Sequence, residues 1–206
     1  MADSQTIGAG GKSGSLQGKD FITIGIFGLL LFICFFAFAM VLGMNANTFW
    51  FTHACGSIPG GIVWMYVAGK VNKRGALAAM DAITAVVGLL LGMFWAGPLG
   101  IFIGAVAAEF ICGVGKNRTT LRCCIAFAVF TLCFWAGQMS MLFLAGSSYV
   151  DMVVASGMSR EYGEALVSFM QSPLILVSLA ATAVVPLFGG WIGSKMFKKH
   201  FSRIAA

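Results

Sequence analysis

Residues 147–173 read SSYVDMVVASGMSREYGEALVSFMQSP, the one long polar interruption in a sequence that is otherwise strongly apolar. Tyr162, Leu166 and Phe169 follow the spacing of one helical face. Ser159 precedes them at the position where an N-cap hydroxyl accepts a backbone N–H. A shorter apolar stripe begins at Tyr149, beyond the Ala155-Ser156-Gly157 break. The stretch therefore predicts two short helices with one apolar face turned inward over a cavity or a membrane surface; a packed external loop is the alternative.

The composition is that of a protein whose solvent is lipid. Hydrophobic residues make up 59% of the 206 residues, and only 10% are charged, against roughly 25% in soluble domains. The net charge of +6 comes from small basic clusters between apolar runs, which indicates membrane topology and not a nucleic-acid partner. This length suffices for one compact helical bundle.

Six apolar runs are candidate membrane spans, because about 20 apolar residues cross the hydrocarbon core as a helix. We predict an all-α integral membrane protein built as a six-transmembrane-helix bundle, with a long extracellular helical loop between helices 5 and 6. The six runs are residues 21–44, 50–69, 76–95, 98–114, 121–145 and 174–197.

The basic residues set the orientation of these spans. With six spans, 12 of the 13 Lys and Arg residues lie on one face, and the positive-inside rule makes that face cytoplasmic. Both termini are then cytoplasmic in the plasma membrane, and residues 147–173 form an extracellular lid segment. Residues 1–18, rich in Gly and Ser, are expected to be a disordered cytoplasmic tail, and residues 19–203 form a single membrane domain.

Polar and aromatic residues at the outer ends of the spans predict a small-molecule pocket. In residues 56–61, Pro59 removes a helical hydrogen bond, which predicts a broken helix of the kind that lines transporter sites. His53 lies one turn above this break. An apolar and aromatic wall with few polar points is typical of such a pocket. The candidate substrate-binding residues are Asn45, Asn47, Trp50, His53, Trp95, Gln138, Tyr149 and Tyr162.

Each of these residues also has a purely structural interpretation. The two tryptophans fit the interfacial belt of a membrane protein. His53 can be a hydrogen-bonded structural residue, and Gln138 can be an interhelical hydrogen-bonding group. The asparagines can cap helices.

Two acidic residues fall inside the predicted spans. Asp81 and Glu109 lie at similar depth on consecutive helices, where a charge at the bilayer centre costs on the order of 3 kcal/mol. They share a proton, pair with Arg118 or Arg122, or contact a partner; pairing or a partner contact is favoured over proton coupling.

Small residues mark places where helices approach closely. Gly100, Gly104 and Ala108 form a stripe on the fourth span that predicts a packing seam. Gly25, Gly28, Gly75 and Ala79 are most simply packing positions of the same kind, and they are also the candidate partner-interface residues.

The sequence contains no catalytic or metal-binding motif. H-E-x-x-H and G-x-S-x-G are absent, and none of the six cysteines forms a C-x-x-C pair. We therefore expect no enzymatic activity, no cofactor and no bound metal.

Three segments together resemble the MptD-type substrate-binding (S) components of energy-coupling factor (ECF) transporters: DFITIGIF at 20–27, SGMSREY at 156–162, and GGWIGSK at 189–195 running into KKHF at 198–201. The resemblance spans residues 19 to 203. It implies a prokaryotic subunit that captures a vitamin-like or other micronutrient at its outer face, hydrolyses no ATP itself, and works with a transmembrane T component and two cytoplasmic ATPases. S components commonly meet the T component through an A-x-x-x-A seam, which residues 25–29 here do not reproduce.

Two other functions remain open on the sequence. One is a self-sufficient small carrier that uses Asp81 or Glu109 for proton coupling. The other is a membrane interaction protein without cargo.

Overall fold

The computed structural model describes residues 15–200, and within this range every regular element is a helix. The helices are α1 Gly18–Leu42, α2 Ala46–Phe49, α3 Thr52–Lys70, α4 Ala76–Leu90, α5 Ala96–Cys112, α6 Thr120–Ala145, α7 Tyr149–Ala155, α8 Arg160–Phe169 and α9 Leu174–His200, with short 3₁₀ turns η1 Gly115–Asn117 and η2 Gly146–Ser148.

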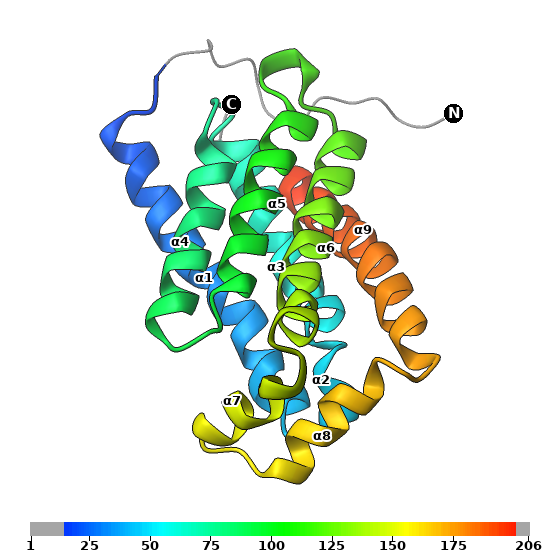
Figure 1. Ribbon diagram of the computed structural model, residues 1–206. Coiled ribbons are helices and arrows are strands. Elements are labelled where there is room, and N and C mark those ends of the chain that lie inside the picture. Colours follow the sequence, from blue (N-terminus) through cyan, green and yellow to red (C-terminus); the bar gives the residue numbers. More distant parts are fainter. Residues whose placement is uncertain (1–14, 201–206) are drawn as a thin grey trace.

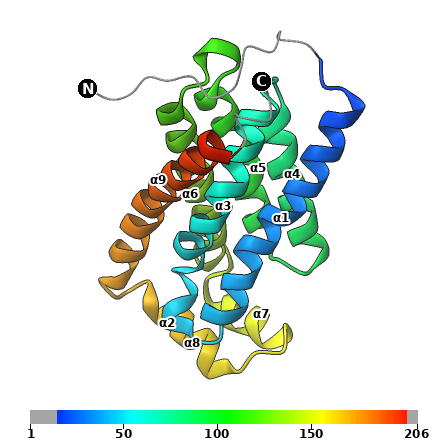
Figure 2. The same ribbon diagram turned by 180° about the vertical axis from the view of Figure 1, so that it is seen from behind.

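Six of these helices run side by side as a bundle, each reversing the direction of the one before (Figure 1). The start of α1 and the end of α9 lie at one end, here called the terminal end. The short helices α2, α7 and α8 gather at the opposite end, the lid end, as the reverse view also shows (Figure 2). All-α architecture and the position of the lid segment at the end away from the chain ends agree with the sequence prediction.

The structure places a helix in each of the six predicted spans. Three of them, α1, α6 and α9, are long and apolar enough to cross a membrane, while α4 and α5 are apolar but shorter. The outward faces of α1 and α9 expose large apolar side chains such as Ile26, Ile33 and Leu176. A face of this kind is stable only against lipid or another apolar surface, so the fold is that of an integral membrane protein.

Pro59 does not break α3, contrary to the sequence prediction. The helix is continuous from Thr52 to Lys70. The glycines beside Pro59 serve close packing: a β-carbon at Gly61 would collide with the backbone of Gly189 in α9. This contact places two helix backbones almost in touch, which only small residues permit.

The predicted seam on α5 is confirmed, and its partner is α6. A β-carbon at Gly100 would meet the backbone of Gly137, and one at Gly104 would lie 2.9 Å from the side chain of Cys133. The seam therefore joins two helices of the same bundle.

The two lid helices form as predicted. Ser159 caps α8, its hydroxyl accepting the Tyr162 N–H at 3.2 Å. Leu166 and Phe169 are buried, whereas Glu161 and Glu164 are exposed. The amphipathic spacing read from the sequence thus correctly identified the inward face.

Helix α1 begins at the boundary predicted between the tail and the membrane domain. Helix α1 starts at Gly18, and the Gln17 N–H donates to the Asp20 carboxylate at 2.8 Å. The same carboxylate pairs with Lys73 at 2.6 Å. Residues 1–14 of the predicted tail, and Arg203 among the predicted cytoplasmic cations, lie outside the described residues. Within the described residues, Arg160 is the basic residue at the lid end, and the other Lys and Arg residues lie toward the terminal end.

Candidate functional site

A cavity of about 210 Å³ lies at the lid end, between the lid helices and the bundle. Its wall is formed by the C-terminal part of α2 and the residue after it, the turn between α4 and α5, one face of α6, and the inner faces of α7 and α8. The lining residues are Phe49, Trp50, Gly92, Met93, Phe94, Gln138, Met141, Tyr149, Val153, Ser156, Met158, Tyr162 and Leu166. Most of this wall is aromatic or aliphatic, with a few polar groups, as in small-molecule sites.

A second, smaller cavity of about 50 Å³ shares part of this wall. Phe49, Met93 and Gln138 line both cavities. His53 and Thr52 line only the smaller one, together with phenylalanines of α1 and α6. The two cavities are therefore neighbours, and these three shared residues lie between them.

Aromatic packing and one hydrogen bond hold the lid over the larger cavity. The Phe169 ring of α8 stacks on Trp50 at 6.3 Å and meets Phe51 edge-on at 6.2 Å between centroids. The Tyr162 hydroxyl donates to the Gly43 carbonyl at 2.5 Å. Gly43 directly follows α1, so this bond ties the lid to the first helix of the bundle.

The backbone of Trp50, the residue on which the lid packs, is held in place by a hydrogen bond from α9. The Ser178 hydroxyl of α9 donates to the Trp50 carbonyl at 2.8 Å and accepts the Trp135 indole N–H at 3.0 Å. All three residues are buried. This chain of bonds links α6, α9 and the segment before α3 directly beneath the cavity.

Of the eight predicted substrate-binding residues, the structure brings four to the larger cavity: Trp50, Gln138, Tyr149 and Tyr162. Burial raises the pKa of Tyr149 to about 12 and also raises that of Tyr162, so both phenols are neutral at pH 7. These residues supply the wall with hydrogen-bonding groups and no charge.

His53 lies in the wall of the smaller cavity. Its ring is 2% exposed, packs edge-on against Phe134 at 4.5 Å, and has the Thr52 hydroxyl 3.4 Å from Nδ1. His53 does not line the larger cavity.

Three of the predicted residues lie at neither cavity. The Asn45 side chain caps α2, accepting the Asn47 N–H at 2.9 Å, and both asparagines are exposed. Trp95 precedes α5 and is 54% exposed. The structure supports the structural interpretations of these residues: Asn45 caps a helix, and Trp95 lies at the surface.

The sequence did not identify Met93, Phe94, Met141 and Val153 as wall residues. Met93 and Phe94 were counted as part of the third span, but α4 ends at Leu90 and leaves both in a turn. Val153 was identified only as part of the apolar stripe of the first lid helix. Gly92 has a positive φ in that turn, and the glycine at the end of the apolar run is a signal that sequence reading could have used.

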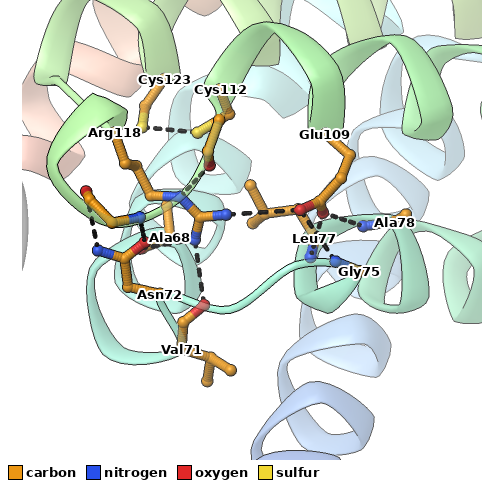
Figure 3. Close-up of polar contacts among 12 residues, drawn as sticks. Ala68, Val71, Asn72, Gly75, Leu77, Ala78, Glu109, Cys112, Arg118 and Cys123 are labelled. Atoms are coloured by element: carbon orange, nitrogen blue, oxygen red, sulfur yellow. Dashed lines mark hydrogen bonds and ion pairs between the residues drawn. The ribbon is translucent and has the colours of Figure 1, made fainter. Parts of the chain in front are cut away.

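The intramembrane acid Glu109 caps a helix at the terminal end. Its carboxylate accepts the backbone N–H groups of Gly75, Leu77 and Ala78 at 3.0, 3.1 and 3.2 Å (Figure 3). A carboxylate at a helix N-terminus satisfies orphan donors and matches the helix dipole. Arg118 lies 3.6 Å from the same carboxylate, which bears out the favoured pairing.

Arg118 itself is fully buried and joins three elements. Its guanidinium donates to the carbonyls of Ala68 and Val71 at the end of α3, at 3.1 Å each, and Nε donates to Gly113 after α5 at 2.8 Å (Figure 3). Arg122 is exposed and bonds the Ile111 carbonyl instead. This cluster holds the terminal end of the bundle together.

The other intramembrane acid, Asp81, has a separate environment. It is fully buried and accepts the Trp64 indole N–H at 3.4 Å, while its second carboxylate oxygen has no partner. Asp81 lines neither cavity. Thus the two acids do not form a shared-proton pair in this structure.

The candidate partner-interface residues are mostly used inside the bundle. A β-carbon at Gly28 would lie 2.9 Å from the Met80 carbonyl of α4, Gly75 is the left-handed residue before α4, and Ala79 packs against the core. A β-carbon at Gly25 or at Gly75 would meet nothing within 4 Å. Gly28, Gly75 and Ala79 have structural roles inside the bundle, in line with the simpler interpretation of these small residues.

Cys112 and Cys123 lie close together at this terminal end. Their sulfur atoms are 2.8 Å apart (Figure 3). No group of three or more His, Cys, Asp or Glu side chains within residues 15–200 is arranged to hold a metal ion.

The chain matches a known protein family over most of its length. A family model described as a hypothetical bacterial integral membrane protein, Trep_Strep, matches residues 18–203. No curated protein and no solved structure matches the chain. The match covers the whole predicted membrane domain. It does not support the specific resemblance to MptD-type components.

Proposed function

This chain belongs to the Trep_Strep family of hypothetical bacterial integral membrane proteins, and from that premise we propose that it is the substrate-capturing S component of an ECF-type importer. The observation that carries the proposal is the cavity of about 210 Å³ between the lid helices and the bundle. Its apolar wall with few polar groups suits a vitamin-like or other micronutrient. The energy then comes from a T component and two cytoplasmic ATPases, and this chain catalyses no reaction.

The position of the cavities supports capture at one face over continuous passage. Both cavities lie in the lid half of the bundle, whereas Arg118 and Glu109 fill the terminal end with paired polar groups. Neither of these two cavities is lined by Arg118 or Glu109. Release on the far side then requires a large movement of the whole subunit, which partner proteins would drive.

The orientation in the membrane belongs to the same proposal. The lid end carries Arg160 and the terminal end carries the other described Lys and Arg residues. The positive-inside rule then places the terminal end in the cytoplasm and the lid outside. Capture from the outer face follows from that orientation.

The proposal is tested by purifying the protein from its native membranes, denaturing it, and identifying co-purified small molecules by mass spectrometry. We expect about one molecule per chain, together with co-purifying ATPase and T subunits. Liposomes holding this chain alone should not accumulate the molecule. Accumulation driven by a proton gradient would instead establish the self-sufficient carrier, and the absence of both ligand and ATPase subunits would establish an interaction protein.

Replacing Tyr162 by phenylalanine tests whether the lid is latched to α1. The variant keeps the ring in the cavity wall but loses the bond to the Gly43 carbonyl. A hydrogen bond contributes about 1 kcal/mol net, so lid opening should rise roughly fivefold. Hydrogen exchange of the α8 amides measures this opening. Ser168→Ala, on the exposed face of α8, is the matched control and should leave the exchange unchanged; equal exchange in both variants would contradict the latch.

A further inference from the structure

The outward face of α9 carries a continuous stripe of exposed side chains that is apolar along most of its length and basic near the terminal end. These side chains recur every three or four residues, so they lie on one side of the helix. The stripe consists of Val177, Ala180, Val184, Phe188, Trp191, Lys195 and Lys199. Helix α9 meets α3 and α6 through its other side, which holds Gly189 and Gly190.

Stacked aromatic rings and an ammonium group mark the place where the stripe changes from apolar to basic. The Phe188 and Trp191 rings stack at 5.7 Å between centroids. The Nζ atom of Lys195 lies 3.8 Å from the centre of the Trp191 ring, a cation–π contact. Indole rings favour the boundary between hydrocarbon and headgroups, and a long lysine stem lets its ammonium group reach the headgroups from an apolar surface. Trp191 and Lys195 therefore lie where the stripe leaves the hydrocarbon.

The ammonium groups of the stripe have no counter-charge in the described part of the chain. Neither Lys195 nor Lys199 forms an ion pair there. The carboxylates of Asp20 and Glu109 each pair with another basic side chain, and Asp81 is fully buried. A lysine ammonium has three donors, so the contact with the Trp191 ring leaves Lys195 able to bind an anion as well. The complementary partner for this end of the stripe is an anion.

The apolar part of the stripe has the length of one bilayer leaflet. From Ala180 to Trp191 the helix rises about 16 Å at 1.5 Å per residue, about half of the roughly 30 Å hydrocarbon core. Val184 and Phe188, between these two residues, are more than half exposed, at 62% and 53%. A molecule that covers the whole stripe is apolar over one leaflet and anionic at its end, which is the structure of an anionic phospholipid.

We propose that this stripe is a binding site for one phospholipid with an anionic headgroup. The acyl chains lie along Ala180, Val184 and Phe188. The phosphate accepts hydrogen bonds from the ammonium groups of Lys195 and Lys199, and the Trp191 ring holds the first of these at the level of the headgroups. The stripe is separate from both cavities, so this lipid site does not depend on the capture of a small molecule under the lid.

Quenching of tryptophan fluorescence by brominated lipids tests the site. The chain has five tryptophans, of which two are exposed: Trp191 in the stripe and Trp95 at the lid end. Trp95→Phe leaves Trp191 as the exposed tryptophan, and Trp191→Phe leaves Trp95 as a matched control. The purified full chain is reconstituted in phosphatidylcholine bilayers that contain equal fractions of either brominated phosphatidylglycerol or brominated phosphatidylcholine.

The quenching of Trp191 should show a preference for the anionic lipid of about tenfold or more, because two lysines each favour it roughly fivefold. The quenching of Trp95 should show no such preference. Equal quenching of Trp191 by the two lipids, or the same preference at Trp95, would overturn the inference. No quenching of Trp191 by either lipid would show that a second copy of the chain covers the stripe, which would overturn it as well.

Substitution of the lysines tests whether a built site or the general surface charge attracts the lipid. Lys195→Gln in the Trp95→Phe chain should lower the preference at Trp191 roughly fivefold, and replacing Lys199 as well should remove most of the remainder. Lys116→Gln, at an exposed cation of η1 at the same end of the bundle, is the control and should leave the preference unchanged. An equal loss in Lys116→Gln, or a preference that survives the loss of both stripe lysines, would overturn the proposed site.

Discussion

Replacing Arg118 by methionine is expected to destabilise the protein by about 3–5 kcal/mol, because it removes a buried guanidinium that donates to three backbone carbonyls and leaves Glu109 without its cation. Methionine approximates the length of the arginine stem but provides no donors. The carbonyls of Ala68, Val71 and Gly113 would lose their side-chain donor, and Glu109 would lose its cation. Thermal unfolding of the purified protein in detergent measures the loss.

Arg122→Met is the matched control for this experiment. Arg122 lies four residues further along the chain and also bonds backbone carbonyls, those of Ile111 and Asn117, but its side chain is exposed. Water can replace an exposed donor, so we expect a loss below about 1 kcal/mol. Equal losses in the two variants would show that burial of Arg118 is not what makes the terminal cluster stable.

Arg118→Lys separates charge from geometry. Lysine keeps the positive charge but cannot reproduce the planar fork with which Arg118 bonds the end of α3 and the residue after α5 at once. The stability of this variant should lie between those of the wild type and Arg118→Met. If Arg118→Lys were as stable as the wild type, the positive charge opposite Glu109 would be sufficient for the stability of the terminal end.

The helices and the inward face of the lid were predictable because both depend on local spacing. In α8 the apolar residues repeat at helical intervals, and Ser159 supplies the cap that fixes where the helix begins. Burial of Leu166 and Phe169 follows from that register alone. The Gly100 and Gly104 stripe was predictable for the same reason.

The residues around the cavity were only partly predictable, because the spacing of residues along a helix does not reveal the conformation of the turns that connect the helices. Asn45 was expected to bind substrate, but its side chain caps a helix of four residues in the segment between the first two predicted spans. Met93 reaches both cavities because α4 stops at Leu90 and the chain turns back. The stop itself is local, with Gly92 at positive φ and the Met93 N–H bonded to the Gly88 carbonyl. That the turn then lines the cavities depends on the packing of the bundle, which a single sequence does not reveal.

Glu109 and Pro59 illustrate the same limit in the bundle. Glu109 was recognised as an acid needing a partner, and Arg118 was one of the two suggested. That its carboxylate also caps α4 follows only from the approach of α5 to Gly75. Pro59 was expected to break α3, but the helix remains continuous where neighbouring glycines let α9 pack closely.

Replacing Phe169 by alanine should open the lid. Phe169 is 1% exposed and packs on Trp50 and Phe51, and truncating a buried phenylalanine costs about 3–5 kcal/mol. Two short helices held mainly by such contacts cannot absorb that loss. We expect the α8 amides to lose protection in hydrogen exchange while those of α6 keep it.

Opening of the lid in Phe169→Ala should abolish ligand retention, because Tyr162 and Leu166 leave the cavity wall with α8. The co-purified small molecule should then be missing from the variant, although the bundle remains folded. Val154→Ala, at an exposed position of α7 outside the wall, should retain it. If Phe169→Ala lost α8 protection but kept its ligand, the binding site would lie deeper than the lid, in the cavity beside His53, and capture would depend on the bundle alone.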